Sequence, residues 1–531
     1  MNTNGRDHGG KLLANAVRLA YRQGQTDYSM EPFVRVDQAG KPVGMIQDGD
    51  SVVFCCRRGE REVELTEAFT ESEFPHFDRS NLTGVYFVIL TLYHEKFKDL
   101  PVAFAPVNLA DTLGELVSRE NRSQMRCSES EKFAHVTFFL NGGNNRAFPG
   151  EMDVRIPSPK GQSYETIPEL SLPRVTEEVI QGIQKGYDLI ITNFANGDVI
   201  GHTSSREAKI QCAAAVDVHL GRVVEAAMAE NYVIAITADH GNLEEMVTAE
   251  GAAHVAHTAN PVPFLLIDPQ TRFRAQVIDG SLSDIAPTIL GVLDIPVPES
   301  MTGTTLAPGH EFGPGRKMLL IILDGWGIGR EDSTNPIYLA ETPVWDRLVA
   351  LYPPSRLQAS GEAVGLKAGK TGNSEAGHMN IGAGRVVLQD DVRLDQAMKD
   401  GSFYTNEVIL KSIRRARENG TSLHLIGLLT EKSSHGSMDY PLAILQMAKD
   451  QGLERVFVHI IFDGRSTEPG SAPDLLEKMD IRMREIGIGE IVSGIGRGIA
   501  LDRDGNYGRI EKTYRSLVQG IGHPYPDVSI K

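Results

Sequence analysis

Residues 318–327 read Met-Leu-Leu-Ile-Ile-Leu-Asp-Gly-Trp-Gly, and this stretch decides the fold of the chain. Its six apolar residues have the length of a strand, and the run stops at Asp324. Residues 187–192 and 232–237 are also largely apolar and are soon followed by Asp or His. Continuous apolar runs of this kind predict strands buried on both faces of a sheet. In parallel sheets functional residues gather beyond the carboxyl ends of the strands, so we expect a site there.

Helical patterns separate the predicted strands, at residues 206–228 and 281–293. Such alternation predicts an α/β fold with a largely parallel sheet. A second α/β pattern occupies residues 422–531, with a helix at 440–450. Its strands are expected at residues 422–428, 455–462 and 491–495, and a further apolar strand is expected at residues 51–56. Because 531 residues are too many for one ordinary domain, we expect two or three domains.

The composition limits the partners of this protein. A net charge of −17 argues against nucleic acid or an anionic membrane, but a local arginine cluster could still bind a small anion. Four cysteines without a C-x-x-C pair favour a reducing compartment and no cysteine metal site. The sequence starts without an apolar signal core, and no apolar run approaches the ~18 residues of a membrane span. We therefore expect a cytoplasmic protein that binds no membrane.

Residues 371–378 read Thr-Gly-Asn-Ser-Glu-Ala-Gly-His and set Ser374 among small residues. A glycine-rich turn can present a hydroxyl to a phosphorus or carbonyl centre, but a serine needs a base or a metal to become nucleophilic near pH 7. Candidate activators follow the predicted strands, namely Asp198, His202, Asp239, His240, His254, His257 and Asp324. Singly, such residues are more often caps or solvated loop residues. Together, their O and N donors predict a two-metal site and a phosphoryl or sulfuryl transferase.

These motifs resemble the cofactor-independent (2,3-bisphosphoglycerate-independent) phosphoglycerate mutase family of the alkaline phosphatase superfamily. The resemblance rests on residues 131–143, 237–242, 256–263, 320–327 and 371–378, and it covers nearly the whole chain. It implies two α/β domains, an alkaline-phosphatase-like parallel-sheet core and a smaller substrate domain. It also implies an isomerase that interconverts 3-phosphoglycerate and 2-phosphoglycerate in glycolysis and gluconeogenesis.

The order of the motifs differs from that of the family. There the Asp-Gly-Trp-Gly strand begins the chain, whereas here it follows the His-Thr-Ala-Asn-Pro-Val-Pro region that ends the family's chains. We therefore expect a circular permutant, in which the Pro/Gly-rich residues 307–315 are a linker joining the former ends. The metal-binding domain would be residues 107–388, and the substrate domain would be discontinuous, built from residues 389–531 plus 1–106.

By this resemblance Ser374 is the nucleophile that becomes phosphoserine. The resemblance implies two divalent metal ions, Mn²⁺ with Zn²⁺ or Co²⁺ as alternatives, and no 2,3-bisphosphoglycerate. One ion would be held by Asp324, Ser374, Asp239 and His240, and the other by Asp198, His202 and His257. His254 is interpreted as a solvated loop histidine. Since the family is commonly monomeric, we expect a monomer.

The resemblance also implies a substrate site for phosphoglycerate. Arginines suit it because their planar fork binds oxyanions bidentately. The expected substrate-binding residues are Arg58, Arg61, Arg465, Ser466, Arg497, Arg503, Lys132 and His435. Lys132 would bridge to the transferred phosphoryl group, and His435 would contact that group or donate a proton. Lys132 and His435 therefore join Ser374 as the expected catalytic residues.

Two segments depart from the family pattern. Residues 463–466 read Asp-Gly-Arg-Ser, so Ser466 stands where the family has an aspartate that is the expected general base. A serine has no accessible pKa for that role. The loop at residues 430–437 keeps His435 but lacks the family's glycines and second histidine. Proximity alone suggests Glu468 or Asp463 as a substitute base.

Two other interpretations stay open. The chain could be a metal-dependent phosphatase or a mutase of another phosphorylated small molecule, because the altered segments lie in the half that handles the substrate hydroxyls. It could also be a metal-binding scaffold that has lost catalysis. The intact set of metal-ligand candidates and the nucleophile Ser374 argue against the scaffold.

Overall fold

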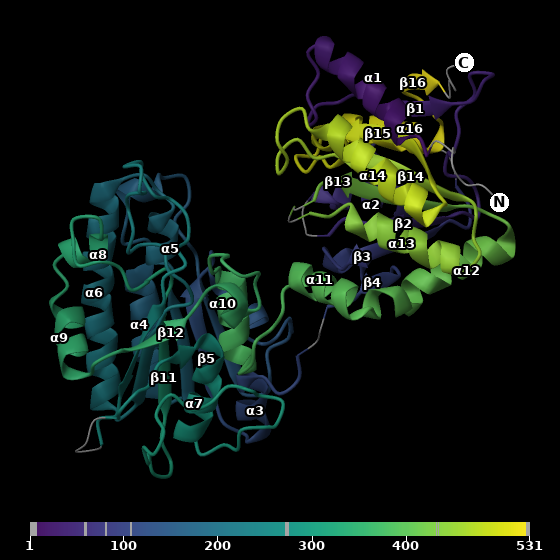
Figure 1. Ribbon diagram of the computed structural model, residues 1–531. Helices are drawn as coiled ribbons and strands as arrows, with labels where there is room; N and C mark the ends of the chain where they lie inside the picture. The colour runs from purple at the N-terminus through teal and green to yellow at the C-terminus, as the bar shows by residue number, and fades with distance from the viewer. Residues whose placement is uncertain are drawn as a thin grey trace. The chain divides into compact units, whose positions relative to one another are not determined.

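The computed structural model describes residues 8–57, 61–79, 82–106, 109–270, 275–431, 433 and 435–526. The chain divides into two compact units, each with an eight-stranded sheet (Figure 1). The continuous unit is Val107–Val392, and the split unit combines Met1–Pro106 with Arg393–Lys531. The expected α/β class with two largely parallel sheets is confirmed.

The sheet of the continuous unit has the strand order β10-β12-β9-β8-β11-β7-β5-β6. From β8 to β6 every neighbouring pair is parallel, whereas β9 is antiparallel to both of its neighbours. The predicted strand at 318–323 is β11, which is wholly buried and lies between β8 and β7 in this parallel set. The strands are β5 (Gln124–Glu129), β6 (Glu151–Ile156), β7 (Leu189–Phe194), β8 (Val233–Thr237), β9 (Val262–Ile267), β10 (Gly280–Ser281), β11 (Met318–Leu323) and β12 (Ser355–Gln358).

Helices cover both faces of this sheet. Figure 1 shows α4 (Leu172–Lys185) and α6 (Arg206–Ala229) on one side, and α3 (Leu113–Arg119), α7 (Ile285–Val292) and α10 (Ser374–Ala383) on the other. The shorter helices are α5 (Asn196–Gly201), α8 (Pro336–Leu339), α9 (Pro343–Leu351), η3 (His135–Phe139), η4 (Tyr164–Thr166), η5 (Leu282–Asp284) and η6 (Gly361–Val364). The helix predicted at 281–293 starts later, because Leu282–Asp284 form a separate turn capped by Ser281 and Asp284.

The sheet of the split unit has the strand order β16-β1-β15-β14-β13-β2-β3-β4. Neighbouring strands from β15 to β4 are parallel, and β1 is antiparallel to β15. The strands are β1 (Phe33–Val36), β2 (Ser51–Phe54), β3 (Tyr86–Thr91), β4 (Val102–Phe104), β13 (Leu423–Leu429), β14 (Val456–Phe462), β15 (Glu490–Gly496) and β16 (His523–Pro526).

Two apolar layers enclose the sheet of the split unit. One layer is formed with α1 (Gly10–Arg22), α12 (Glu407–Asn419), α13 (Asp439–Asp450) and α14 (Ala472–Ile486). The other is formed with α2 (Val63–Thr70), α15 (Arg497–Ala500) and α16 (Tyr507–Val518). The remaining helices are α11 (Asp390–Asp400), η2 (Glu95–Phe97) and η7 (Ser402–Thr405).

The segment interpreted as a linker, residues 307–315, is irregular chain that leads into β11. It is held in place just before that strand. The buried Arg316 forms an ion pair with Asp268, which follows β9, and Arg316 Nη1 also donates to the Phe312 carbonyl at 2.7 Å. His310 Nε2 lies 3.1 Å from the same aspartate. The segment is therefore anchored to the sheet at two residues.

In the part of the chain that the structure describes, every helix is too short or too polar to cross a membrane.

Candidate functional site

Four neighbouring parallel strands of the continuous unit, β8, β11, β7 and β5, lead into a cluster of charged residues. Asp324 directly follows β11, and Asp239 and His240 lie just beyond β8. β7 leads into α5, which carries Asp198 in its first turn, and the loop after β5 carries Lys132. The carboxyl ends of parallel strands meet at one edge, so residues far apart in sequence come together here.

Two glycines let these segments approach closely. Gly325 has a φ of +74°, and a Cβ atom there would lie 2.7 Å from the backbone nitrogen of Asp198. A Cβ atom at Gly197 would lie 2.4 Å from the carbonyl oxygen of Asp324. Any larger side chain would therefore separate the strand end from α5. The close approach of Gly325 to Asp198 therefore explains why a glycine follows Asp324.

Ser374 differs from the sequence expectation in its backbone setting. It was expected in a glycine-rich turn, but it is the first residue of α10, whose N-cap Asn373 accepts a hydrogen bond from Ala376 N at 2.9 Å. The N-terminus of a helix favours negative charge, since backbone N–H groups there lack helical partners. Ser374 Oγ lies 2.9 Å from His240 Nε2 and 3.4 Å from Asp324 Oδ1.

Lys132 links the serine to two carboxylates. Its buried Nζ donates to Asp198 Oδ2 at 2.6 Å, to Asp324 Oδ1 at 2.8 Å and to Ser374 Oγ at 2.7 Å. Burial alone would lower the pKa of Lys132, but the Asp324 and Asp198 carboxylates raise it above its ordinary value. The ammonium group therefore stays charged and provides a fixed positive charge beside the serine oxygen.

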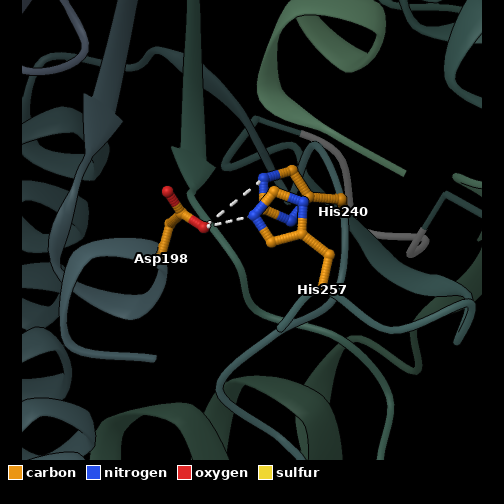
Figure 2. A group of neighbouring side chains, drawn as sticks. All are labelled: Asp198, His240 and His257. Carbon is orange, nitrogen blue, oxygen red and sulfur yellow. Dashed lines mark ion pairs between the residues drawn. The ribbon is translucent and has the colours of Figure 1, made fainter. Parts of the chain in front are cut away.

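Two groups of possible metal ligands overlap at His240. Asp239, His240 and Asp324 form one group, and Asp198, His240 and His257 form the other, with all ligand atoms of a group within 4.8 Å. Figure 2 shows the second group, in which one Asp198 oxygen faces both imidazoles at 3.8 Å for His240 and 3.0 Å for His257. The rings of His240 and His257 stack with centroids 4.0 Å apart.

The donor set fits divalent cations. Three buried aspartates meet one lysine here, so the fixed charges of the carboxylates outweigh that of the ammonium. Asp239 Oδ2 is buried and accepts no hydrogen bond from a described residue, although His378 Nδ1 lies 3.3 Å away. A buried carboxylate oxygen without a donor is costly unless a cation takes that place. Mixed carboxylate and imidazole donors suit Zn²⁺ and Mn²⁺.

The electrostatics of the aspartates follow from their neighbours. Burial would raise the pKa of Asp198, but the Lys132 ammonium and hydrogen bonds from His202 and His257 hold it well below its usual range. For Asp324, burial and repulsion from Asp239 prevail over Lys132, and its pKa is raised. The carboxylates therefore compete for the same positive charge, which adds to the preference of this edge for cations.

The two outer histidines present one nitrogen to the cluster. His202 Nδ1 lies 2.8 Å from the Val255 carbonyl, and His257 Nδ1 lies 2.8 Å from the Gly372 carbonyl. With Nδ1 donating to a carbonyl, Nε2 is the nitrogen left for a metal ion, which would replace the proton that Nε2 donates to Asp198. The Nε2 atoms of the two rings are 3.0 Å apart, and His202 Nε2 lies 3.2 Å from Asp198 Oδ1.

His254 lies outside both groups of possible metal ligands among the described residues. Its backbone carbonyl accepts a hydrogen bond from Lys209 Nζ at 2.6 Å. Burial lowers the pKa of Lys209 to about 8. His254 therefore contributes to the loop before His257 through its backbone.

Three residues that the sequence reasoning missed hold the cluster in place. Asn193 Nδ2 donates to Asp324 Oδ2 at 2.7 Å, and Asn242 Nδ2 donates to Asp198 Oδ1 at 3.1 Å. His378 lies one helical turn after Ser374, with Nδ1 2.9 Å from the Ser374 carbonyl. Of these three, only His378 could have been predicted from the sequence, because its spacing of four residues from Ser374 puts both residues on one helix face.

A second polar edge lies in the split unit, at the carboxyl ends of β2, β13, β14 and β15. Arg497 begins α15 directly after β15 and is buried, with Nη1 2.5 Å from Oδ1 of the buried Asp463. Arg61 is also buried and donates to the Leu501 carbonyl at 3.0 Å. His435 lies in the loop after β13, where its carbonyl accepts a hydrogen bond from Arg57 N at 2.8 Å.

The other expected substrate residues of this edge are less enclosed. Arg465, Ser466 and Arg503 are exposed. Ser466 Oγ lies 3.3 Å from Ser433 Oγ. Arg58, the remaining arginine of the expected set, lies outside the described residues.

The fold and the cluster of aspartates and histidines are those of a metal-dependent enzyme, and the chain belongs to the metalloenzyme superfamily. The model of that superfamily matches residues 25–296. A second family model, described as the N-terminus of BPG-independent PGAM, matches residues 394–529.

The chain is similar to proteins named 2,3-bisphosphoglycerate-independent phosphoglycerate mutase. That of Syntrophotalea carbinolica is 46% identical over 299 residues, which are 55% of this chain and 57% of that protein. That of Desulforudis audaxviator is 45% identical over 292 residues, with the same two shares. The matched region thus spans little more than half the length of these relatives. A crystal structure of Leishmania mexicana phosphoglycerate mutase is 28% identical over 51% of this chain and 52% of its own, but its TM-score of 0.40 is too low to support a fold assignment.

Proposed function

We propose that this chain interconverts 3-phosphoglycerate and 2-phosphoglycerate through a phosphoserine at Ser374. The observation that carries the proposal is the setting of Ser374 Oγ, which lies within 2.9 Å of both Lys132 Nζ and His240 Nε2. Relatives at 45–46% identity bear the name of this mutase. Transfer to an enzyme group and back divides one difficult displacement into two easier ones.

The metal ligands of the proposal are Asp324, Ser374, Asp239 and His240 for one ion, and Asp198, His202 and His257 for the other. Bound divalent ions would lower the pKa of the serine hydroxyl and neutralise the phosphoryl oxygens. We infer Mn²⁺, with Zn²⁺ or Co²⁺ as alternatives, because the donors are carboxylates and imidazoles and include no thiolate. The cluster of aspartates and histidines supports this assignment.

The chain's own residues supply charge and orientation. Lys132 donates to Ser374 Oγ and would stay beside the phosphoryl group as it arrives, because the group binds at that oxygen. Ser374 is the first residue of α10, and the N-terminus of a helix favours an anion. Positioning and neutralisation of charge supply most of the catalysis in phosphoryl transfer.

In the split unit, we assign binding of the glycerate to Arg58, Arg61, Arg465, Arg497 and Arg503, together with Ser466 and His435. This set is supported by the position of Arg497, Arg465 and His435 beyond the carboxyl ends of neighbouring parallel strands. Guanidinium groups can hold the substrate carboxylate while its hydroxyls exchange roles.

We also infer that the chain is a circular permutant, with the metal-binding domain at residues 107–388 and the substrate domain at 389–531 plus 1–106. The family model described as an N-terminus matches residues 394–529, near the end of this chain, which supports the altered order. A permutant also accounts for the partial coverage of the relatives, because a collinear alignment stops at the joint. Residues 307–315 would then join the former ends.

The proposal places the enzyme in the cytoplasm as a monomer. All four cysteines are buried and free, as is usual in reducing compartments. Neither an additional phosphoglycerate cofactor nor a nucleic acid is part of the mechanism.

A phosphatase or a mutase of another phosphorylated small molecule is the second candidate. The observation that favours it is Ser466, a residue that cannot act as the expected base. One assay separates the candidates: 3-phosphoglycerate is added with Mn²⁺, and 2-phosphoglycerate and free phosphate are followed together. The mutase yields 2-phosphoglycerate, and Ser374→Ala removes that product. Free phosphate without 2-phosphoglycerate would instead establish the phosphatase.

A further inference from the structure

His435 forms a dyad with a residue that the sequence reasoning did not single out. His435 Nδ1 lies 3.0 Å from Oε1 of Glu62, the N-cap residue of α2. The Glu62 side chain is 0% exposed, whereas the His435 side chain is 16% exposed. Solvent therefore reaches part of the His435 side chain but not the Glu62 carboxylate. With Nδ1–H donating to Glu62, the basic electron pair of the neutral ring lies on Nε2. A buried carboxylate that orients an imidazole in this way is a recurrent arrangement for acid–base catalysis.

The backbone on both sides of the dyad is fixed. Arg57 N donates to the His435 carbonyl at 2.8 Å, and Cys56 pairs with Gly436 in an antiparallel bridge. On the other side, Thr66 N and Oγ1 both donate to the Glu62 carbonyl, at 3.2 and 2.8 Å. The dyad therefore needs no rearrangement to present the ring.

Two titratable neighbours of Glu62 are the thiol of Cys56 and the phenol of Tyr93. Burial raises the pKa of the Cys56 thiol well above its ordinary value, and the nearby Glu62 carboxylate raises it further. Burial and the same carboxylate raise the pKa of the Tyr93 phenol. Both neighbours are neutral near pH 7, so neither repels the carboxylate from the imidazole by ionising.

The dyad lies beside the position where the expected base is absent. Ser466 Oγ is 3.3 Å from Ser433 Oγ, and the Ser433 hydroxyl oxygen accepts a hydrogen bond from His435 N at 3.2 Å. The loop that carries His435 thus contacts the very residue that replaces the aspartate. Glu468, which sequence proximity suggested, is exposed and two residues beyond Ser466.

We propose that His435, oriented by Glu62, is the general acid and base at the substrate hydroxyls and replaces the base missing at Ser466. The inference rests on the proposed function, because it names the group that moves the protons of that same reaction. His435 is the catalytic residue, and Glu62 is a positioning residue that acts through it.

The proton transfers balance over the cycle. The imidazolium of His435 gives its Nε2 proton to O3 of the glycerate as the O3–P bond breaks and the Ser374 alkoxide, whose proton left to solvent before the cycle and which forms again at its end, bonds to phosphorus. The neutral ring then takes the proton of the C2 hydroxyl as O2 bonds to phosphorus and the Ser374 Oγ–P bond breaks. His435 is again an imidazolium, and one phosphoryl group has moved from O3 to O2.

The test compares wild type with Glu62→Gln in the presence of 3-phosphoglycerate and Mn²⁺. Glutamine keeps the shape and an acceptor oxygen but removes the charge. We expect kcat for 2-phosphoglycerate formation to fall between about 10²- and 10⁴-fold, with a small change in KM. The alkaline limb of kcat/KM for 3-phosphoglycerate should move to lower pH, because the first transfer needs the imidazolium, and an imidazolium without the carboxylate loses its proton more readily. Diethyl pyrocarbonate labelling of His435 can be quantified by mass spectrometry at a series of pH values. Its midpoint should move to lower pH in the same way, and this measurement needs no turnover.

Glu64→Gln is the matched control. Glu64 lies on the same helix, is buried, and accepts a hydrogen bond from Gly505 N at 2.9 Å rather than from a histidine. The Glu64→Gln change should leave the pH dependence of turnover the same as in wild type. A second variant tests compensation, since Ser466→Asp should restore turnover in the Glu62→Gln background but add little to wild type.

Each outcome decides between the ideas. A Glu62→Gln enzyme with the wild-type pH profile, turnover and labelling midpoint overturns the dyad while the mutase proposal stands. A large gain in turnover from Ser466→Asp in wild type also overturns the dyad, since His435 would then not be the general base. Wild type that forms phosphate but no 2-phosphoglycerate overturns the proposed function itself, together with the inference built on it.

Discussion

The two sheets end in opposite kinds of edge. In the continuous unit Asp239, His240 and Asp324 are fully buried beside a charged lysine, and their possible ligand atoms lie within 4.8 Å of one another. In the split unit Arg465 and Arg503 are exposed to solvent. A site for cations must hold several like charges together before a ligand arrives, which requires burial and supporting hydrogen bonds. Long arginine side chains repel each other less in solvent, so an anion site can stay open until its ligand binds.

Among the predicted changes, removal of the metal ions should have the largest effect on turnover. It should act only at the buried edge of the continuous unit. We expect turnover to be lost after chelation and regained with Mn²⁺, and Asp239→Asn to bind fewer metal ions per chain by elemental analysis. The control is Asp217→Asn, a buried aspartate of the same unit that accepts hydrogen bonds from Val344 N and Trp345 N. It should lower stability and keep the metal content. Equal metal content in wild type and Asp239→Asn would contradict the ligand assignment.

Gly325→Ala tests how tightly the buried edge is assembled. A methyl group would lie 2.7 Å from Asp198 N at a φ of +74°. We expect metal affinity to fall about 10- to 100-fold by calorimetry, as for changes in residues that support ligands. Gly369→Ala has nearly the same φ, +73°, but no atom within 4 Å. Gly369→Ala should lower the free energy of unfolding only by the backbone strain, of order 1 kcal/mol, and leave the metal affinity unchanged. Equal effects of the two variants would mean that crowding at Asp198 is unimportant.

Arg465→Ala tests the exposed edge. Because the side chain is solvated before binding, its loss should raise KM for 3-phosphoglycerate about 10-fold, while the unfolding midpoint stays the same. Arg455→Ala is the control, since Arg455 is an exposed arginine at the opposite end of β14. Steady-state kinetics should show no effect of that change. A similar rise in KM for both variants would point to a general loss of positive charge instead.

The smallest expected effect is the response of the split unit to acid. His424 and His459 are buried in its sheet with nitrogens 3.0 Å apart, and His424 also contacts Asp50. Burial lowers the pKa of both imidazoles. Unfolded histidines titrate near ~6.5, so below that pH the unfolded state binds more protons and stability is lost as the pH falls. The slope is about 1.4 kcal/mol per pH unit for each proton.

This acid response can be measured by urea unfolding followed through hydrogen exchange of peptides from β13 and β14. His459→Asn should flatten the dependence between pH 6.5 and pH 5, because one fewer group takes up a proton on unfolding. An unchanged slope would show that other groups cause the loss of stability.

Much of the buried edge could be predicted from the sequence. Apolar runs such as 318–323 have no polar residue to place in solvent, so they form central strands and bring Asp324 and Asp239 to one edge. The sequence did not predict that His240 would belong to both groups of ligands or that Ser374 would begin a helix. Those features depend on how closely α10 approaches the loop after β8, where a Cβ atom at Gly377 would lie 2.6 Å from the carbonyl oxygen of Asp239.

The split unit was harder to predict. Glu62 carries no motif, and only the folding of α2 against the loop after β13 brings it to His435, 373 residues away in sequence. The missing aspartate at Ser466 was visible in the sequence, where proximity alone suggested Glu468 or Asp463 as a substitute base. Glu468 is exposed and Asp463 is paired with Arg497, whereas the carboxylate that contacts His435 comes from another strand–helix connection.

The phosphoserine itself gives the most direct test of the account. Enzyme loaded with Mn²⁺ is mixed with 3-phosphoglycerate, quenched in acid within one turnover, digested and analysed by mass spectrometry. We predict one phosphoryl group on the peptide that contains Ser374, absent in Ser374→Ala and lost again as 2-phosphoglycerate forms. Formation of 2-phosphoglycerate without phosphate on Ser374 at any time point would contradict the central claim.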